Sequence, residues 1–299
     1  MKSEQQLLRV SLVANMVIAV AALATAAAAR SMAILFDGMY ALIACLMTMV
    51  SSKVVEVLSR PDDNDYPFGY QNWEPLLNAV KGLVILAVGV NTFFSSFKSF
   101  LAGGRLPIFS FAAAYALFAM VLSLIMAFLS KNRGRKIGSP ILQVEARNWM
   151  IGGLLSGVVA AAFTIGFFGE GEFVLYLDPL LTMAMVALVI PVPIKIIYTA
   201  FRQLLFVAPD KALVEVMRER YRAFPKDDRI VQSALRVTKV GRVIYVHITA
   251  VLFKDTCLKV GELDIIRRDI AAAVVKDDPH TFCDVLFTSR STEPVSLSI

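Results

Sequence analysis

Two acidic residues and their polar neighbours lie inside long apolar stretches of the sequence, where ionisable groups are rare. Asp37 is followed by Tyr40, and Glu145 is followed by Asn148. At about 100° per residue, the members of each pair lie on one face of a helix. An ionisable side chain at membrane depth is costly and is a functional candidate by default. The sequence therefore predicts two polar stripes, on two different helices, along a path through a helix bundle.

These residues also allow interpretations that involve no chemistry. Asp37 could lie at the outer edge of the membrane and face lipid headgroups. Glu145 could be a charge at the inner interface, because Arg147 is close to it in sequence. Lys81 is about 10 Å along its predicted helix from Glu74. It could extend its stem to the cytoplasmic surface, or place a fixed charge beside Glu74 or in a central cavity.

The elements that carry these residues are predicted membrane helices. Hydrophobic residues make up 57% of the chain and the mean hydropathy is +0.66, both too high for a soluble globular protein. Several apolar runs reach the roughly 20 residues that cross a bilayer. We predict six spans, at 8–29, 32–57, 74–98, 109–129, 140–167 and 178–200. In the sixth, Asp178 and Pro179 are typical of a helix N-terminus, and Pro191 and Pro193 predict a kink.

Basic residues mark one side of the predicted bundle. They precede the first span and follow the second, fourth and sixth, whereas the loop between spans five and six has no Lys or Arg. Lys98 and Arg105, between spans three and four, are exceptions. The positive-inside rule predicts that both termini are cytoplasmic, and we expect the spans to cross the inner cell membrane. Basic loops also account for the net charge of +6 without nucleic acid as a partner.

The composition changes after residue 206 to that of a small soluble domain. An amphipathic helix at 211–224 precedes strand patterns at 229–240 and 242–253, a helix at 263–275 and a strand at 282–288. This order suits helices packed on one face of a sheet. We therefore expect a transmembrane domain over 1–206 and a cytoplasmic domain over 207–299. A disulfide between Cys257 and Cys283 is allowed but not required.

Several short motifs occur in order along the chain. Phe36-Asp37-Gly38 opens the second span, Tyr66-Pro67-Phe68-Gly69-Tyr70 lies in the next loop, and Ala208-Pro209-Asp210 follows the last span. Together with the α/β tail, they resemble the cation diffusion facilitator family over nearly the whole chain. The resemblance implies a six-helix bundle with a ferredoxin-like cytoplasmic domain and a homodimer. It also implies that a divalent cation is exchanged for protons by alternating access.

The resemblance implies a transport site from which this chain departs. The family uses two pairs of Asp and His side chains, spaced i and i+4 on spans two and five, a set suited to zinc. The corresponding positions here are Asp37, Ala41, Asn148 and Gly152. Only Asp37 is an ionisable ligand among them. A zinc site of the usual composition is therefore not expected.

The donors that remain are oxygens, and oxygen donors favour harder cations such as manganese or magnesium over zinc. We expect the cation to be held by Asp37, Tyr40, Glu145 and Asn148. Asp37 would bind the cation and a proton in alternation, with no resident cofactor. Zinc and iron remain open as substrates.

Other functions remain open at this point. The chain could be a non-transporting dimeric membrane scaffold or sensor. It could also carry a monovalent or organic cation, bound by Asp37 and by the rings of Tyr40 and Trp149. No phosphate-binding glycine loop, nucleophile elbow or HExxH motif occurs, so an enzyme is not expected. His247, in a strand pattern, is expected to be structural, although with His280 it could form a weak metal site in the tail.

Overall fold

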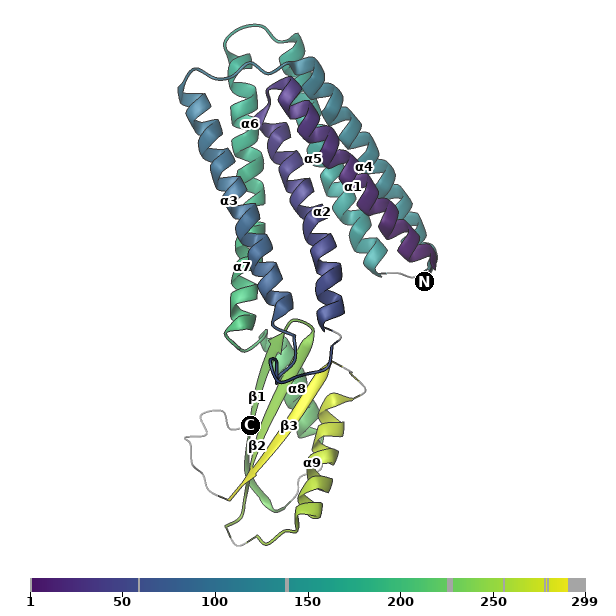
Figure 1. Cartoon of the computed structure of the whole chain (residues 1–299), viewed down its shortest axis with the longest axis vertical. Helices are drawn as coiled ribbons and strands as arrows, with labels where there is room; N and C mark the ends of the chain where they lie inside the picture. The colour runs from purple at the N-terminus through teal and green to yellow at the C-terminus, as the bar shows by residue number, and fades with distance from the viewer. Residues whose placement is uncertain are drawn as a thin grey trace. The chain divides into compact units, whose positions relative to one another are not determined.

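The computed structural model describes residues 2–58, 60–137, 140–224, 228–254, 256–276, 278 and 280–289. The chain divides into two compact units, one of residues 1–52 and 80–195 and the other of residues 53–79 and 196–299. The helices are α1 (Lys2–Ala29), α2 (Met32–Leu58), α3 (Trp73–Leu101), α4 (Phe109–Ile137), α5 (Pro140–Phe168), α6 (Phe173–Val189), α7 (Pro191–Leu204), α8 (Lys211–Arg222) and α9 (Val260–Val275). The strands are β1 (Ile230–Val240), β2 (Val243–Leu252) and β3 (Thr281–Thr288) (Figure 1).

The long helices are those of a membrane protein. Within the described residues, α1, α3, α4, α5 and the consecutive pair α6 and α7 are long and apolar enough to cross a bilayer. The apolar part of α2 is shorter, Met32–Met47. α6 ends at Val189 and α7 begins at Pro191, but Ile190 between them keeps helical backbone angles, so the predicted kink stays a prediction. Proline at a first helical position lacks only an N–H that would have no partner in the helix.

The predicted start of the sixth span at Asp178 is wrong. α6 begins at Phe173, and both Asp178 and Pro179 lie inside it. Pro179 has no N–H to donate to the carbonyl of Leu175. That carbonyl instead accepts a hydrogen bond of 2.7 Å from the backbone N–H of Arg105, in the loop between α3 and α4. An internal proline is tolerated because a neighbouring segment supplies the missing donor.

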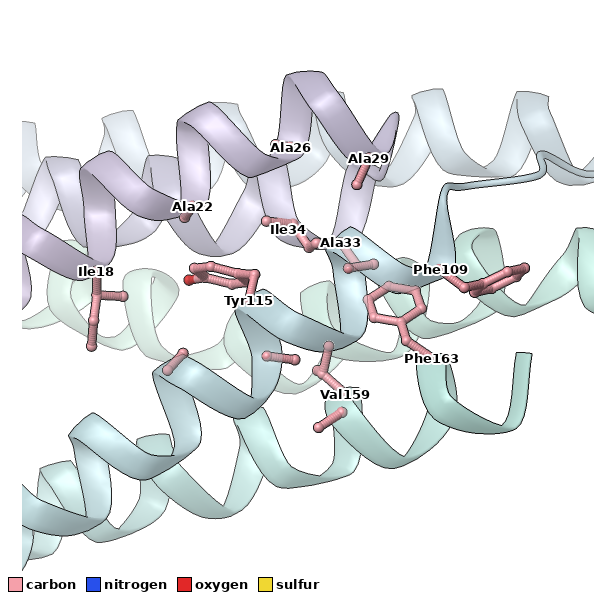
Figure 2. Close-up of a cluster of buried hydrophobic side chains, with 14 of the residues drawn as sticks. Ile18, Ala22, Ala26, Ala29, Ala33, Ile34, Phe109, Tyr115, Val159 and Phe163 are labelled. Atoms are coloured by element: carbon pink, nitrogen blue, oxygen red, sulfur yellow. The ribbon is translucent and has the colours of Figure 1, made fainter. Parts of the chain in front are cut away.

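The core of the first unit is rich in alanine. α4 packs along α5 and against α1, and Figure 2 shows the alanines of α1 close to α2 and α4. The buried cluster includes Ala22, Ala26, Ala29, Ala33, Ile34, Tyr115 and Phe163. Small side chains let helix backbones approach closely where no water drives association. At Gly38, an added Cβ would lie 2.7 Å from the Cβ of Ala22, so α2 is pressed against α1 next to Asp37.

The C-terminal domain is a three-stranded sheet in the order β1-β2-β3. β1 pairs antiparallel with β2, and β3 pairs parallel with β2 after the crossover through α9. Side chains from α8 and α9 pack on one face of the sheet, around Met217, Leu235, Val246, Ile248, Ile270 and Val285. The predicted α-β-β-α-β order and the α+β, ferredoxin-like class are confirmed. The observed helix and strand ends differ from the predicted ones by only a few residues.

All three cysteines are free, so the structure contains no disulfide between Cys257 and Cys283. Cys45 is buried in α2, Cys257 is exposed and Cys283 is half-buried in β3. Burial, together with the adjacent Asp284 carboxylate, raises the pKa of the Cys283 thiol to about 11. The reactive form of a thiol is the thiolate.

We therefore expect one fast-reacting thiol in the folded protein at pH 8. Maleimide should modify Cys257 quickly, because that thiol is exposed, and should modify Cys283 and Cys45 only after denaturation. Mass spectrometry of timed samples measures this. Cys257→Ser should abolish the fast phase and Cys283→Ser should leave it. Two fast thiols in the native protein would contradict the placement of Cys283.

The α3–α4 loop provides a matched pair of glycine substitutions. Gly103 and Gly104 both have positive φ angles, +95° and +89°. A Cβ at Gly103 would meet nothing within 4 Å, whereas one at Gly104 would lie 2.5 Å from the carbonyl oxygen of Leu175. We expect Gly103→Ala to show only the left-handed strain of roughly 1–2 kcal/mol. Gly104→Ala should lower the melting temperature in detergent further. Equal shifts would show that the loop does not pack on Leu175.

Candidate functional site

Asp37 faces the interior of the first unit. It is half-buried in the second turn of α2, and its Oδ2 accepts a hydrogen bond of 2.5 Å from the hydroxyl of Tyr115 on α4. Tyr115 is buried in the alanine-rich cluster (Figure 2). A contact with a buried partner on another helix argues against a headgroup-facing position for Asp37.

Tyr40 lies one turn after Asp37 on α2, on the same helix face. It is half-buried, and its ring is tilted against that of Phe36 with 6.4 Å between centroids. Tyr40 therefore shares a helix face with Asp37, and its described contact is with Phe36 rather than with the carboxylate.

Glu145 belongs to a different cluster, between α5 and α1. The hydroxyl of Ser11 donates to its Oε1. The indole N–H of Trp149 lies 2.9 Å from Ser11 Oγ and 3.1 Å from Glu145 Oε1. Ser11 and Trp149 are both buried, whereas Arg147 is exposed. The described contacts of Glu145 are thus neutral donors within the bundle.

Asn148 is exposed on α5, and a Cβ added at Gly152, one turn further, would meet nothing within 4 Å. Within the described residues, no hydrogen bond or ion pair joins Asp37 to Glu145 or Asn148. No three His, Cys, Asp or Glu side chains among those residues gather closely enough to hold a metal. The structure therefore brings Asp37 to α4 and Glu145 to α1, without assembling the four predicted residues.

Asp178, predicted as the N-cap of its own helix, instead caps α2. Its Oδ1 accepts from the hydroxyl of Ser31 at 2.5 Å and lies 3.4 Å from the N–H of Ala33. Its Oδ2 accepts from the N–H of Met32 at 3.1 Å. The helix that carries Asp37 therefore begins on a carboxylate supplied by α6.

The second unit contains the other polar residues that the sequence analysis discussed. In the loop after α2, a hydrogen bond from the Tyr70 hydroxyl lowers the pKa of the Asp63 carboxyl. Glu74 lies 3.6 Å from Arg242 as an ion pair.

The two histidines lie at the sheet. His247 on β2 has its Nδ1 3.4 Å from Oδ2 of Asp284 on β3, and the backbone carbonyl of His280 accepts from Ile244 N–H. Each histidine therefore has a contact within the fold of this small domain.

Sequence reasoning missed the neutral partners of the acidic residues. Tyr115, Ser11 and Ser31 are polar residues at or inside apolar runs, and that exception to the pattern is the available signal. Ser31 also directly precedes an apolar helical run, as an N-cap does. Which carboxylate each one contacts is not encoded locally, because the partners lie far apart in the sequence.

Comparison with known proteins places these features in a family. The cation efflux transmembrane domain matches residues 8–205. The manganese efflux system protein MneP of Bacillus subtilis (strain 168) is 22% identical over 279 residues, covering 92% of this chain and 91% of MneP. The magnetosome protein MamB of Magnetospira sp. (strain QH-2) is 26% identical over 255 residues, 82% of each chain. An uncharacterized transporter of Methanocaldococcus jannaschii is 21% identical over 248 residues, 83% of this chain and 86% of that protein.

The family match covers well over half of the chain, and it includes the helices that carry Asp37, Glu145 and Asp178. Relatives match across both the helical bundle and the C-terminal domain. This chain therefore belongs to the cation efflux family and is a multi-pass membrane protein of a cation-transporter family.

Proposed function

We propose that this protein exports a divalent cation in exchange for protons, and that Asp37 is the ionisable group of its transport site. The observation that carries the proposal is the hydrogen bond from the hydroxyl of Tyr115 on α4 to the carboxylate of Asp37 on α2. Because of this bond, the carboxylate faces the interior of the bundle. Manganese is the first substrate to test, because oxygen donors suit it and a relative is named as a manganese efflux protein. Magnesium, zinc and iron are the comparison ions.

Coupling follows from competition for one carboxylate. Asp37 can bind a proton or a cation but not both, so loading one releases the other. Tyr115 occupies one oxygen of Asp37 with a neutral donor, and a phenol can both donate and accept. Tyr40, one turn away, supplies a further oxygen. Water completes the coordination shell, as it commonly does around hard cations.

Asn148 and Glu145 are proposed to contribute from α5 in another state of an alternating-access cycle. Asn148 is exposed in the present arrangement, and Glu145 is bonded to Ser11 and Trp149. Glu145 must leave those donors before its Oε1 can reach a cation. We further propose a homodimer in the inner membrane, with cytoplasmic termini and a cytoplasmic domain from residue 207 onward.

The central test is Asp37→Asn in proteoliposomes that contain purified protein. Asn keeps the size of Asp and one acceptor oxygen but cannot carry a negative charge. We expect proton-driven Mn²⁺ flux to fall at least about tenfold, because contacts with a charged group are worth roughly 1.5–3 kcal/mol. Tyr115→Phe, which keeps the carboxylate, should retain flux with a changed apparent affinity. Wild-type exchange in Asp37→Asn would remove the basis of the proposal.

The same assay separates the proposed function from its alternatives. A scaffold or sensor would give no saturable, proton-coupled flux with any of the four divalent ions. An organic-cation carrier would transport a quaternary ammonium ion, would lose that flux in Asp37→Asn, and would show no Mn²⁺ flux.

A gain of ligand at Gly152 provides a second test. The open space there accommodates a side chain, whereas a Cβ at the next residue, Gly153, would lie 3.1 Å from the side chain of Leu124. We expect Gly152→Asp to bind Zn²⁺ about tenfold more tightly or better, because it adds a charged ligand to the set. Calorimetry measures the affinity. Gly153→Asp is the matched control and should lower the melting temperature without tightening Zn²⁺ binding. Unchanged affinity in Gly152→Asp would place that position outside the site.

A further inference from the structure

The start of α2 is a tight reversal in which Arg30 is exposed and Ser31 is buried. α1 ends at Ala29, Arg30 adopts a left-handed backbone with φ 55°, and Ser31 donates its N–H to the carbonyl of Ala26 at 3.3 Å. Ser31 is only 2% exposed. The first N–H groups of a helix have no partner within that helix. Because Ala33 and Ile34 are buried, other protein groups are needed to accept hydrogen bonds from their N–H groups.

Two side chains supply the acceptors. The Ser31 hydroxyl oxygen accepts from the N–H of Ile34 at 3.3 Å, as a helix N-cap does. Asp178 accepts from the Ser31 hydroxyl and from the N–H groups of Met32 and Ala33. Asp178 is 1% exposed, and a carboxylate at a helix N-terminus is also favoured by the helix dipole. α6 is therefore fastened to the first turn of α2 by one side chain.

The turn of α6 that carries Asp178 is itself held in place. The hydroxyl of Thr182 donates to the backbone carbonyl of Asp178 at 2.7 Å, a local bond within α6 that fastens the turn to no other segment. One turn before Asp178, the Leu175 carbonyl, freed by Pro179, accepts from Arg105 in the α3–α4 loop. The carboxylate thus projects from a fixed point, so any shift of the first turn of α2 must stretch its hydrogen bonds.

Asp37 is six residues beyond Ser31, about 9 Å along the same helix. α2 passes Ala22 of α1 too closely at Gly38 to accept a Cβ, and Asp37 itself meets Tyr115. With its N-terminus held by Asp178, α2 has little freedom to rotate or slide, and the direction of Asp37 is set.

We propose that Asp178 is a positioning residue, which orients the Asp37 carboxylate by fixing the first turn of α2 against α6. The test of this inference by Mn²⁺ flux rests on the proposed function, whereas its test by amide hydrogen exchange does not. Asp178 does not touch the cation. It acts through Ser31 and the α2 backbone, and its loss changes how well Asp37 meets the substrate.

The variants differ in which contact they remove. Asp178→Asn keeps the shape but replaces one acceptor oxygen with an NH2 group that must face donors. Ser31→Ala removes one of the three donors to the carboxylate. Asp178→Glu restores the charge on a side chain one methylene longer. Thr182→Val is the matched control, because it removes a buried hydroxyl from the same turn and leaves the carboxylate in place.

We expect Asp178→Asn to raise the KM for Mn²⁺ flux about tenfold, the effect of losing one charged hydrogen bond, while Vmax per folded transporter changes less. Ser31→Ala should shift KM in the same direction by less, and Asp178→Glu should recover part of the loss. Thr182→Val should lower the melting temperature and leave KM unchanged. Amide hydrogen exchange of residues 32–34 should be faster in Asp178→Asn than in Thr182→Val.

Wild-type KM in folded Asp178→Asn would overturn the proposal, as would KM changes equal to those of Thr182→Val. If Asp178→Asn does not fold, KM is compared between Ser31→Ala and Ser31→Thr, which retains the hydroxyl. Wild-type KM in Ser31→Ala would then overturn the proposal. If the wild-type protein shows no cation flux, the proposed function fails, and hydrogen exchange alone decides whether Asp178 holds α2. Unchanged exchange of residues 32–34 would then overturn the inference.

Discussion

The structure depends on the requirement that the buried carboxyl groups and the freed backbone groups of the helical bundle find partners in the protein. An unpaired donor or acceptor that is buried away from water has a large energetic cost. The turn of α6 from Leu175 to Pro179 shows how this requirement organises the fold. Its freed carbonyl is bonded by Arg105 and its carboxylate by the start of α2. Each connection satisfies a local deficit and at the same time fixes a neighbouring segment.

The acidic residues inside the bundle follow one pattern. Asp37 is bonded by the Tyr115 hydroxyl, Glu145 by the Ser11 hydroxyl, and Asp178 by the Ser31 hydroxyl. In each case a neutral hydroxyl from a distant part of the sequence donates to the carboxyl group. Neutral donors stabilise a buried carboxyl group without the fixed counter-charge of an ion pair. At Asp37, such a partner leaves the group available to a mobile cation or proton.

Membership of the cation efflux family supports cation transport as the general activity, but the chemistry of the site depends on particular residues. Ala41 and Gly152 provide no side-chain ligand where the family resemblance implies one. In the arrangement described here, Asp37 and Glu145 have different partners, Tyr115 for one and Ser11 and Trp149 for the other. A site built mainly from oxygen donors, with water in the remaining positions, is suited to a hard cation such as Mn²⁺.

The sequence alone was sufficient for features that depend on local pattern. Apolar length predicted the membrane helices, and alternation and amphipathic periods predicted the order of the C-terminal domain. These signals are local because a helix or strand shows its environment in its own side-chain period. The sequence also selected Asp37 as a candidate, since a carboxylate in an apolar run stands out without any knowledge of its partner.

Tertiary structure decided what each polar residue contacts. Asp178 and Pro179 are typical of a helix start, yet α6 begins five residues before Asp178, at Phe173. The helix continues through Pro179 because another segment donates to the Leu175 carbonyl that the proline leaves without a partner. The partners of Asp37 and Asp178 are 78 and 147 residues away in sequence. Sequence periodicity reports which face of a helix is polar, but not which neighbouring helix meets that face. The packing of α1, α2, α4 and α6 determines those contacts, and with them the direction in which Asp37 points.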